Sequence, residues 1–130
     1  RIGKPVEIQA LWLNALAVMA SLEPRAKKLA KSARDGETVF ELDWDMLRRK
    51  GTASFRKRFW NAKKKCLFDV VDGPSGDDAS IRPNQLFAVS LPAPLLPARQ
   101  ARAVVDAAEK HLLTFSQERD ETRYFSGIRK

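Results

Sequence analysis

The feature that most constrains the fold is an uncharged stretch near the start of the chain, residues 8–20. It follows Glu7, and its only strongly polar side chains are Gln9 and Asn14. A helix that is apolar nearly all round is normally covered by other elements on several sides. The stretch therefore predicts a helix over residues 5–22 that is buried on most sides within a layered helical assembly.

The length of the chain limits how such a helix can be covered. With 130 residues, the chain has room for about five helices, too few to surround the first one. The first residues contain neither an initiator methionine nor a signal-peptide pattern. We therefore expect the chain to be a piece of a larger domain that continues beyond both ends.

Proline, glycine and capping signals divide the first half of the chain. Pro24 is predicted to end the first helix and to start a second one that reaches about Arg34. Asp43 is the predicted N-cap of a third helix, over residues 43–60. Gly51 is predicted to weaken or interrupt that helix.

The second half of the chain alternates short apolar runs with turns. Residues 67–71 are predicted to be extended, and residues 72–78 are predicted to form a loop because of their glycine, proline and aspartate content. Residues 83–91 form a predicted short apolar helix, and residues 97–113 a longer amphipathic one. Residues 116–130 are predicted to be loop or disordered.

Composition excludes several classes of protein. An apolar fraction of 44% is enough for a core, and no apolar run approaches the ~20 residues of a membrane span. The single cysteine, Cys66, cannot form an internal disulfide, so we expect a reducing, cytoplasmic location. Cys66 and the single histidine, His111, are too few for an ordinary zinc site, and we favour structural roles over a catalytic pair. No metal or cofactor is predicted.

The net charge of +8 raises the possibility of an anionic partner. Basic residues are dense between Arg48 and Lys65, and Phe55, Phe59 and Trp60 lie among them. Nucleic-acid surfaces use such interleaving of cations and aromatics. Phe55 and Phe59, however, share the spacing of one buried helical stripe, so we favour a core role for them over a nucleic-acid surface.

A dense polar cluster occupies residues 78–85, directly before an apolar run. It contains Asp78, Arg82, Asn84 and Gln85, with Pro83 where a helix would begin. Surface loops seldom need so many side-chain donors and acceptors. The cluster therefore indicates a site for a ligand rich in hydroxyl groups.

Several ordered blocks of the chain resemble one protein family. Residues 3–16, with the sequence GKPVEIQALWLNAL, resemble the GKPVEINALWYNAL segment of the glycogen debranching enzyme C-terminal, or amylo-α-1,6-glucosidase, family. Residues 55–61, 68–73 and 78–92 resemble further blocks of that family in the same order, as does the helix that ends in Leu112-Leu113-Thr114. The resemblance implies a partial domain over residues 1–114 and a divergent charged tail over residues 115–130.

The resemblance implies both a fold and a function. The expected fold is all-α, part of an (α/α) six-hairpin toroid around a glucan-binding pocket. The expected function is removal of α-1,6-linked glucose at branch points of glycogen or limit dextrin by an inverting, two-carboxylate mechanism. The partner would be a branched α-glucan, and both main catalytic carboxylates are expected outside residues 1–130.

Seven residues are candidates for the substrate pocket. They are Glu7, Trp12, Asn14, Asp78, Arg82, Asn84 and Gln85. Carboxylates can accept hydrogen bonds from sugar hydroxyls, amides can both donate and accept, and an indole offers an apolar platform for a sugar ring. Arg82 could hold Asp78 or Glu7 in a charge-assisted pair.

Structural roles compete with binding at four of these positions. Glu7 and Asp78 can cap helices, Trp12 can belong to the core, and Arg82 can form a purely structural ion pair. Two other functions remain open at this point. One is a glucan-binding remnant without catalysis, and the other is a basic helical module that binds nucleic acid.

Overall fold

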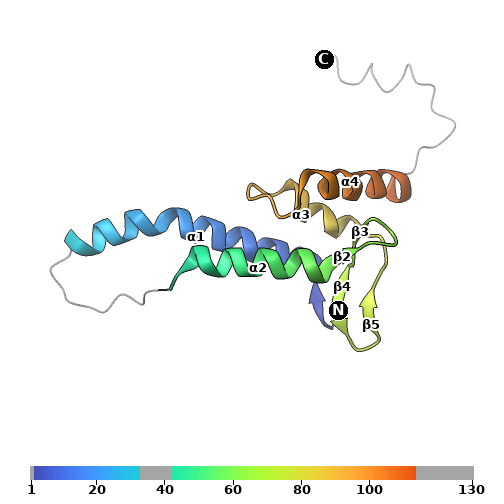
Figure 1. The fold of residues 1–130 in the computed structure, drawn as a ribbon, viewed down its shortest axis with the longest axis horizontal. Coiled ribbons are helices and arrows are strands. Elements are labelled where there is room, and N and C mark those ends of the chain that lie inside the picture. Colours follow the sequence, from blue (N-terminus) through green and yellow to red (C-terminus); the bar gives the residue numbers. More distant parts are fainter. Residues whose placement is uncertain (1, 33–41, 114–130) are drawn as a thin grey trace, which may run out of the picture.

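The computed structural model describes residues 2–32 and 42–113, without the side chains of residues 26–32 (Figure 1). The described part is mostly helical. Its helices are α1 (Val6–Ser32), α2 (Trp44–Phe59), the 3₁₀ helix η1 (Pro83–Leu86), α3 (Phe87–Ser90) and α4 (Ala98–Leu112). Its strands are β1 (Lys4–Pro5), β2 (Trp60–Asn61), β3 (Cys66–Leu67), β4 (Val70–Gly73) and β5 (Gly76–Asp78). The predicted tail, residues 116–130, lies outside the described residues.

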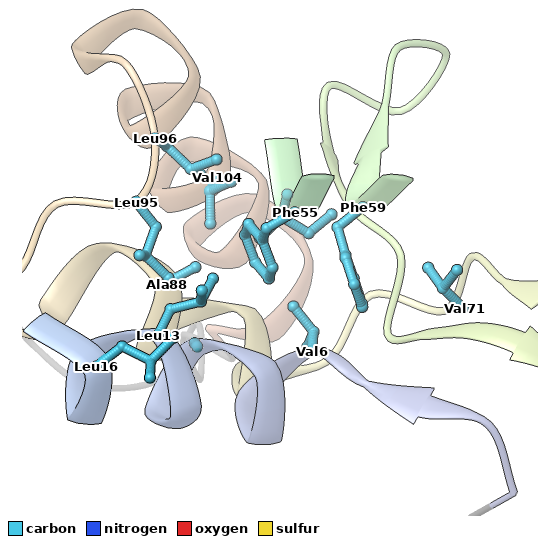
Figure 2. Packing of buried hydrophobic residues seen from close by; sticks show 12 residues of the cluster. Val6, Leu13, Leu16, Phe55, Phe59, Val71, Ala88, Leu95, Leu96 and Val104 are labelled. Atoms are coloured by element: carbon cyan, nitrogen blue, oxygen red, sulfur yellow. The ribbon is translucent and has the colours of Figure 1, made fainter. Parts of the chain in front are cut away.

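The core lies where α1 and α2 run side by side and meet the segment from α3 to α4 (Figure 1). Figure 2 shows apolar side chains from these elements pointing toward one another. Helix α1 contributes Val6, Ala10, Leu13 and Leu16, which recur at helical spacing. The other fully or nearly buried members are Phe55, Phe59, Leu67, Val71, Ala88, Leu95, Leu96 and Val104.

Helix α1 is buried on one face only, so the prediction that most of its sides are covered is wrong for this chain. Its exposed large side chains are Ile8, Leu11, Trp12, Val18, Met19 and Leu22. At 3.6 residues per turn they fall on one side of the helix and form one apolar stripe opposite the core. The expectation that the chain is too short to surround this helix is confirmed.

Pro24 lies inside α1 and does not end it, which corrects the predicted break. Proline removes one backbone hydrogen bond and favours a kink, but it leaves the rest of the helical ladder in place. Pro24 itself is exposed. The predicted second helix is therefore the last part of α1, and its expected end at Arg34 lies outside the described residues.

Helix α2 begins as predicted, with Asp43 as its N-cap. The Asp43 carboxylate accepts a hydrogen bond from the Met46 backbone N–H at 2.7 Å. The helix continues through Gly51 without interruption. A Cβ at Gly51 would lie 2.5 Å from Leu13 Cδ2, so the glycine permits close approach of α2 to α1.

The aromatic residues of α2 belong to the core. The Phe55 and Phe59 rings stack with centroids 4.7 Å apart, and both side chains are buried. Trp44 and Trp60 are partly buried against the same cluster. This arrangement confirms the prediction of a buried aromatic stripe and leaves these two phenylalanine rings unavailable for base stacking.

Two small antiparallel sheets correct the all-α prediction. One has the strand order β1-β4-β5, and the other pairs β2 with β3. Residues 72–78, predicted as a loop, form most of the β4–β5 hairpin, in which Gly73 pairs with Gly76. At the other edge, Gly3 has φ +114° and lies so close to the Val71 carbonyl that a Cβ would be 2.9 Å away.

Asp72 joins three elements through its carboxylate. Lys4 Nζ lies 2.6 Å from Asp72 Oδ2, and Arg58 Nη2 lies 2.7 Å from Asp72 Oδ1. These contacts link the N-terminal strand, the end of α2 and the hairpin. They hold the pKa of Asp72 below its usual value, the hydrogen bond from Lys4 being the largest cause.

Replacing Pro24 with alanine tests the continuity of α1. Pro24→Ala restores a backbone donor within the helix, so we expect stabilisation by about 1–3 kcal/mol. Urea denaturation followed by helical circular dichroism measures the change, with the neighbouring Arg25→Ala as a control that should have little effect. An unchanged midpoint and helix content for Pro24→Ala would contradict a continuous helix.

Acid should weaken the Asp72 links. Because the folded-state pKa of Asp72 is depressed, its stabilising contribution is present above the unfolded-state pKa of about 3.9 and is lost as pH falls through the folded-state value. Asp72→Asn should therefore lower the urea midpoint at neutral pH, and its difference from the unsubstituted chain should shrink on acidification. A difference that is the same at every pH would contradict this role of the carboxylate.

Candidate functional site

The site is built around the β4–β5 hairpin and the turn that follows it (Figure 1). Val70 pairs with Asp78 across the hairpin, which brings Asp78 back beside the start of β4. Gly76, at φ +92°, adopts a backbone conformation that other residues rarely enter, and it closes the hairpin turn. The hairpin therefore brings the chain back beside Asp69 before the polar cluster begins.

Asp69 lies between β3 and β4 and is buried, with 1% of its side chain exposed. Its backbone carbonyl accepts from the Val6 N–H at 2.9 Å, and its own N–H donates to the Asp78 carbonyl at 2.8 Å. Its carboxylate accepts hydrogen bonds from Arg82 Nη1 and, at 3.4 Å, from Asn84 Nδ2. One residue therefore contacts the start of α1, the end of β5 and the polar turn.

Arg82 occupies an extended position directly before Pro83. Its φ and ψ of −132° and 158° are typical of a residue that precedes proline. Pro83 then begins η1, where the missing N–H removes no helical hydrogen bond. Arg82 Nη1 contacts both Asp69 Oδ2 and, at 3.2 Å, Asp78 Oδ2, while 44% of its side chain remains exposed.

Gln85 is buried and fastens this turn to the core. Its Oε1 accepts from the Leu67 N–H at 3.2 Å, and its Nε2 donates to the Arg82 carbonyl, also at 3.2 Å. Both ends of the amide are thus engaged in contacts that set the backbone path. Asn84, by contrast, contributes its amide to the Asp69 carboxylate.

A cavity of about 720 Å³ lies against the hairpin. Asp78 and Arg82 line it together with Ile2, Val70, Gly73, Pro74, Ser75, Gly76, Asp77 and Ala79. It therefore presents one strong donor, Arg82, and two carboxylate acceptors, Asp77 and Asp78, beside a wall that contains glycine and proline. Groups of this kind suit a polar, uncharged ligand that carries many hydroxyls.

The Asp78 carboxylate is held in its ionised form. Its hydrogen bonds with Ser80, including one from the Ser80 backbone N–H at 2.9 Å, lower its pKa, and the charge of Arg82 lowers it further. The same network raises the pKa of Arg82, chiefly through its hydrogen bond to Asp69. Asp78 can consequently accept hydrogen bonds in this site but is not a proton donor.

The remaining predicted pocket residues, Glu7, Trp12 and Asn14, lie on α1. Glu7 is half-buried in the first turn of α1, next to Val6. Asn14 is buried and ties α1 to the segment before α4. It donates to the carbonyls of Ala10 at 3.2 Å and Ala93 at 3.4 Å and accepts from the Ala93 N–H at 2.8 Å.

Trp12 belongs to a different cavity, of about 470 Å³, between α1 and α2. Its side chain is 57% exposed, and Leu16, Lys50 and Arg58 are among the residues that share this lining. The structure therefore brings Asp78, Arg82, Asn84 and Gln85 together, with Glu7 nearby. It places Trp12 and Asn14 farther along α1.

Asp69 is the residue that sequence reasoning missed as a site candidate. A signal was present, because Asp69 is a lone carboxylate within the apolar run from Cys66 to Val71. A charged side chain buried in such a run must find a partner. The two contacting residues, Arg82 and Asn84, were already candidates, but the sequence alone did not connect them to Asp69.

The described residues do not support a cysteine–histidine pair, a metal site or a membrane-spanning helix. Cys66 is fully buried and burial raises the pKa of its thiol, whereas His111 is exposed near the end of α4. Within residues 2–32 and 42–113, no group of three or more histidine, cysteine, aspartate or glutamate side chains could hold a metal ion. None of the described helices combines the length and apolar character that a bilayer span requires.

Comparison with known families matches residues 1–117 to a family described as amylo-alpha-1,6-glucosidase. No curated protein and no solved structure matches the chain. The matched range includes the start of α1, the hairpin and the polar turn, which are the elements that build the site. Because the match covers most of the 130 residues, the chain belongs to the amylo-alpha-1,6-glucosidase family.

Proposed function

We propose that this chain is part of a glycosidase domain that removes α-1,6-linked glucose at branch points of glycogen or limit dextrin. The observation that carries the proposal is the paired Asp78 and Arg82 at a cavity of about 720 Å³ in a member of the amylo-alpha-1,6-glucosidase family. The proposed partner is a branched α-glucan, and the proposed location is the cytoplasm, where such a substrate is stored.

The proposed role of the cavity is to bind sugar hydroxyls. Arg82 uses Nη1 for both of its carboxylate contacts, so its Nε and Nη2 have no hydrogen-bond partner among the described residues. These nitrogens can donate to the ligand, and the partly exposed Asp78 carboxylate can accept from it. Asn84 and Gln85 support the turn from behind, and Glu7 lies at the adjoining end of α1.

The catalytic carboxylates are proposed to lie outside residues 1–130. An inverting glycosidase needs a protonated acid with a raised pKa and a base that admits a water molecule between them. Asp78 does not fit the acid role, because its pKa is lowered. A glucan-binding remnant without catalysis is the second candidate, and the lowered pKa of Asp78, a carboxylate that lines the cavity, favours it.

The finer architecture is also a proposal. An (α/α) six-hairpin toroid would place further helices against the exposed apolar stripe of α1, and the α1–α2 pair would be one of its hairpins. The stripe supports this proposal, because a helix is seldom apolar on a face that remains in water. Residues 1–114 would then form a partial domain, and residues 115–130 a divergent tail.

Alanine substitutions at the cavity test the proposed function. Asp78→Ala and Asn84→Ala should each weaken binding of limit dextrin by about ten-fold, because each removes a hydrogen-bonding group or its support. Affinity gel electrophoresis of the chain measures this, and glucose release measures it in an intact family member with the corresponding substitutions. Asp106→Ala, on the exposed face of α4, is the control. Unchanged affinity and kinetics at both positions would overturn the site assignment.

Charge substitutions on α1 test whether its apolar stripe is an unfilled interface. The isolated chain should self-associate, and Val18→Lys with Leu22→Lys should reduce this association. The control is Ala53→Lys with Ala62→Lys, which adds the same charge at exposed positions away from the stripe. Sedimentation equilibrium measures the effect. A chain that is monomeric without any substitution would contradict the expectation.

A further inference from the structure

Asp69 connects the two cavity residues with the rest of the fold through different sets of atoms. Its backbone holds Asp78, by the N–H that donates to the Asp78 carbonyl, and it holds α1, by the carbonyl that accepts from Val6. Its carboxylate holds Arg82 and Asn84. A change of the carboxylate alone therefore leaves the two backbone hydrogen bonds in place and alters the contacts with Arg82 and Asn84.

The carboxylate of Asp69 contacts one nitrogen of the Arg82 guanidinium. Asp69 is not among the residues that line the cavity, whereas Arg82 is. Both carboxylates that contact Arg82 do so at Nη1, so the guanidinium is held through this one nitrogen. Its Nε and Nη2 contact neither carboxylate, and 44% of the Arg82 side chain is exposed. A flexible arginine held in this way loses less conformational freedom when it binds a ligand.

We infer that Asp69 is a positioning residue for sugar binding, which acts by orienting the Arg82 guanidinium toward the hydroxyls of an α-glucan. The inference rests on the proposed function, because it assigns Asp69 a role within the same site. Asp69 is not among the residues that line the cavity. Its buried carboxylate instead holds the partly exposed Arg82 side chain in one orientation beside Asp78.

Asp69→Asn is the variant that isolates this role. It keeps the size of the side chain and both backbone hydrogen bonds, and it removes the negative charge that holds Arg82. Asp72→Asn is the control, because it makes the same chemical change three residues away, in β4. It removes links to Lys4 and Arg58 and does not touch Arg82 or line the hairpin cavity.

The experiment measures the affinity of each variant for limit dextrin by affinity gel electrophoresis and its melting temperature by circular dichroism. Asp69→Asn should weaken dextrin binding by about ten-fold, and Asp72→Asn should leave it unchanged. In a double-mutant cycle, Asp69→Asn should have no further effect on affinity once Arg82→Gln is present, because its action passes through Arg82.

The outcomes separate this inference from the proposed function. Equal dextrin affinity of Asp69→Asn and Asp72→Asn, or additive effects of Asp69→Asn and Arg82→Gln, would overturn the positioning role while the proposed function stands. No binding of dextrin by the unsubstituted chain would overturn the proposed function and this inference with it. A lower melting temperature with unchanged affinity would assign Asp69 a purely structural role.

A second variant covers the case in which Asp69→Asn does not fold. Arg82→Lys changes a side chain that is 44% exposed and keeps a positive charge near Asp69. It removes the planar set of donors that Asp69 orients. Weakening of dextrin binding by about ten-fold would support the inference, and unchanged binding by a folded Arg82→Lys chain would overturn it.

Discussion

The buried carboxylate and backbone of Asp69 are the interaction on which the arrangement of the site depends. Through them, the first residue of α1, the end of β5 and the polar turn meet at one point. A carboxylate that is removed from water is costly unless it is paired and hydrogen-bonded, and here Arg82 and Asn84 provide that compensation. The same contacts that satisfy the buried charge therefore also orient the groups beside the cavity.

Helix α1 shows how one element serves both the core and a further contact surface. Its buried face, with Leu13 against Gly51 of α2, forms the core of this chain. Its opposite face is equally apolar and is exposed. We propose that the larger glycosidase domain covers this face, because apolar stripes of this extent are seldom left in water. The stripe and the hairpin site would then belong to the same larger domain.

Much of the architecture was predictable from local signals in the sequence. The N-cap at Asp43, the buried Phe55 and Phe59 pair and the start of η1 at Pro83 follow from short-range rules, and the family resemblance is confirmed. The helix through Pro24 was missed because proline removes one backbone hydrogen bond without ending a long helix. The β4–β5 hairpin was missed because strand pairing outweighs local preference. Within the candidate site, the turn residues were predictable, but the contacts of Asp69 with Arg82 and Asn84 span 13 and 15 residues. No periodic pattern connects positions so far apart.

The central claim is that the hairpin and the polar turn bind a branched α-glucan. The most direct test is to map the amide chemical shifts of the chain by NMR while a short α-1,6-branched glucan oligosaccharide is added. The account predicts concentration-dependent shifts at Gly76, Asp78, Arg82 and Asn84, with little change at the exposed end of α4. Shifts confined to other surfaces, or no shifts at saturating oligosaccharide, would contradict it.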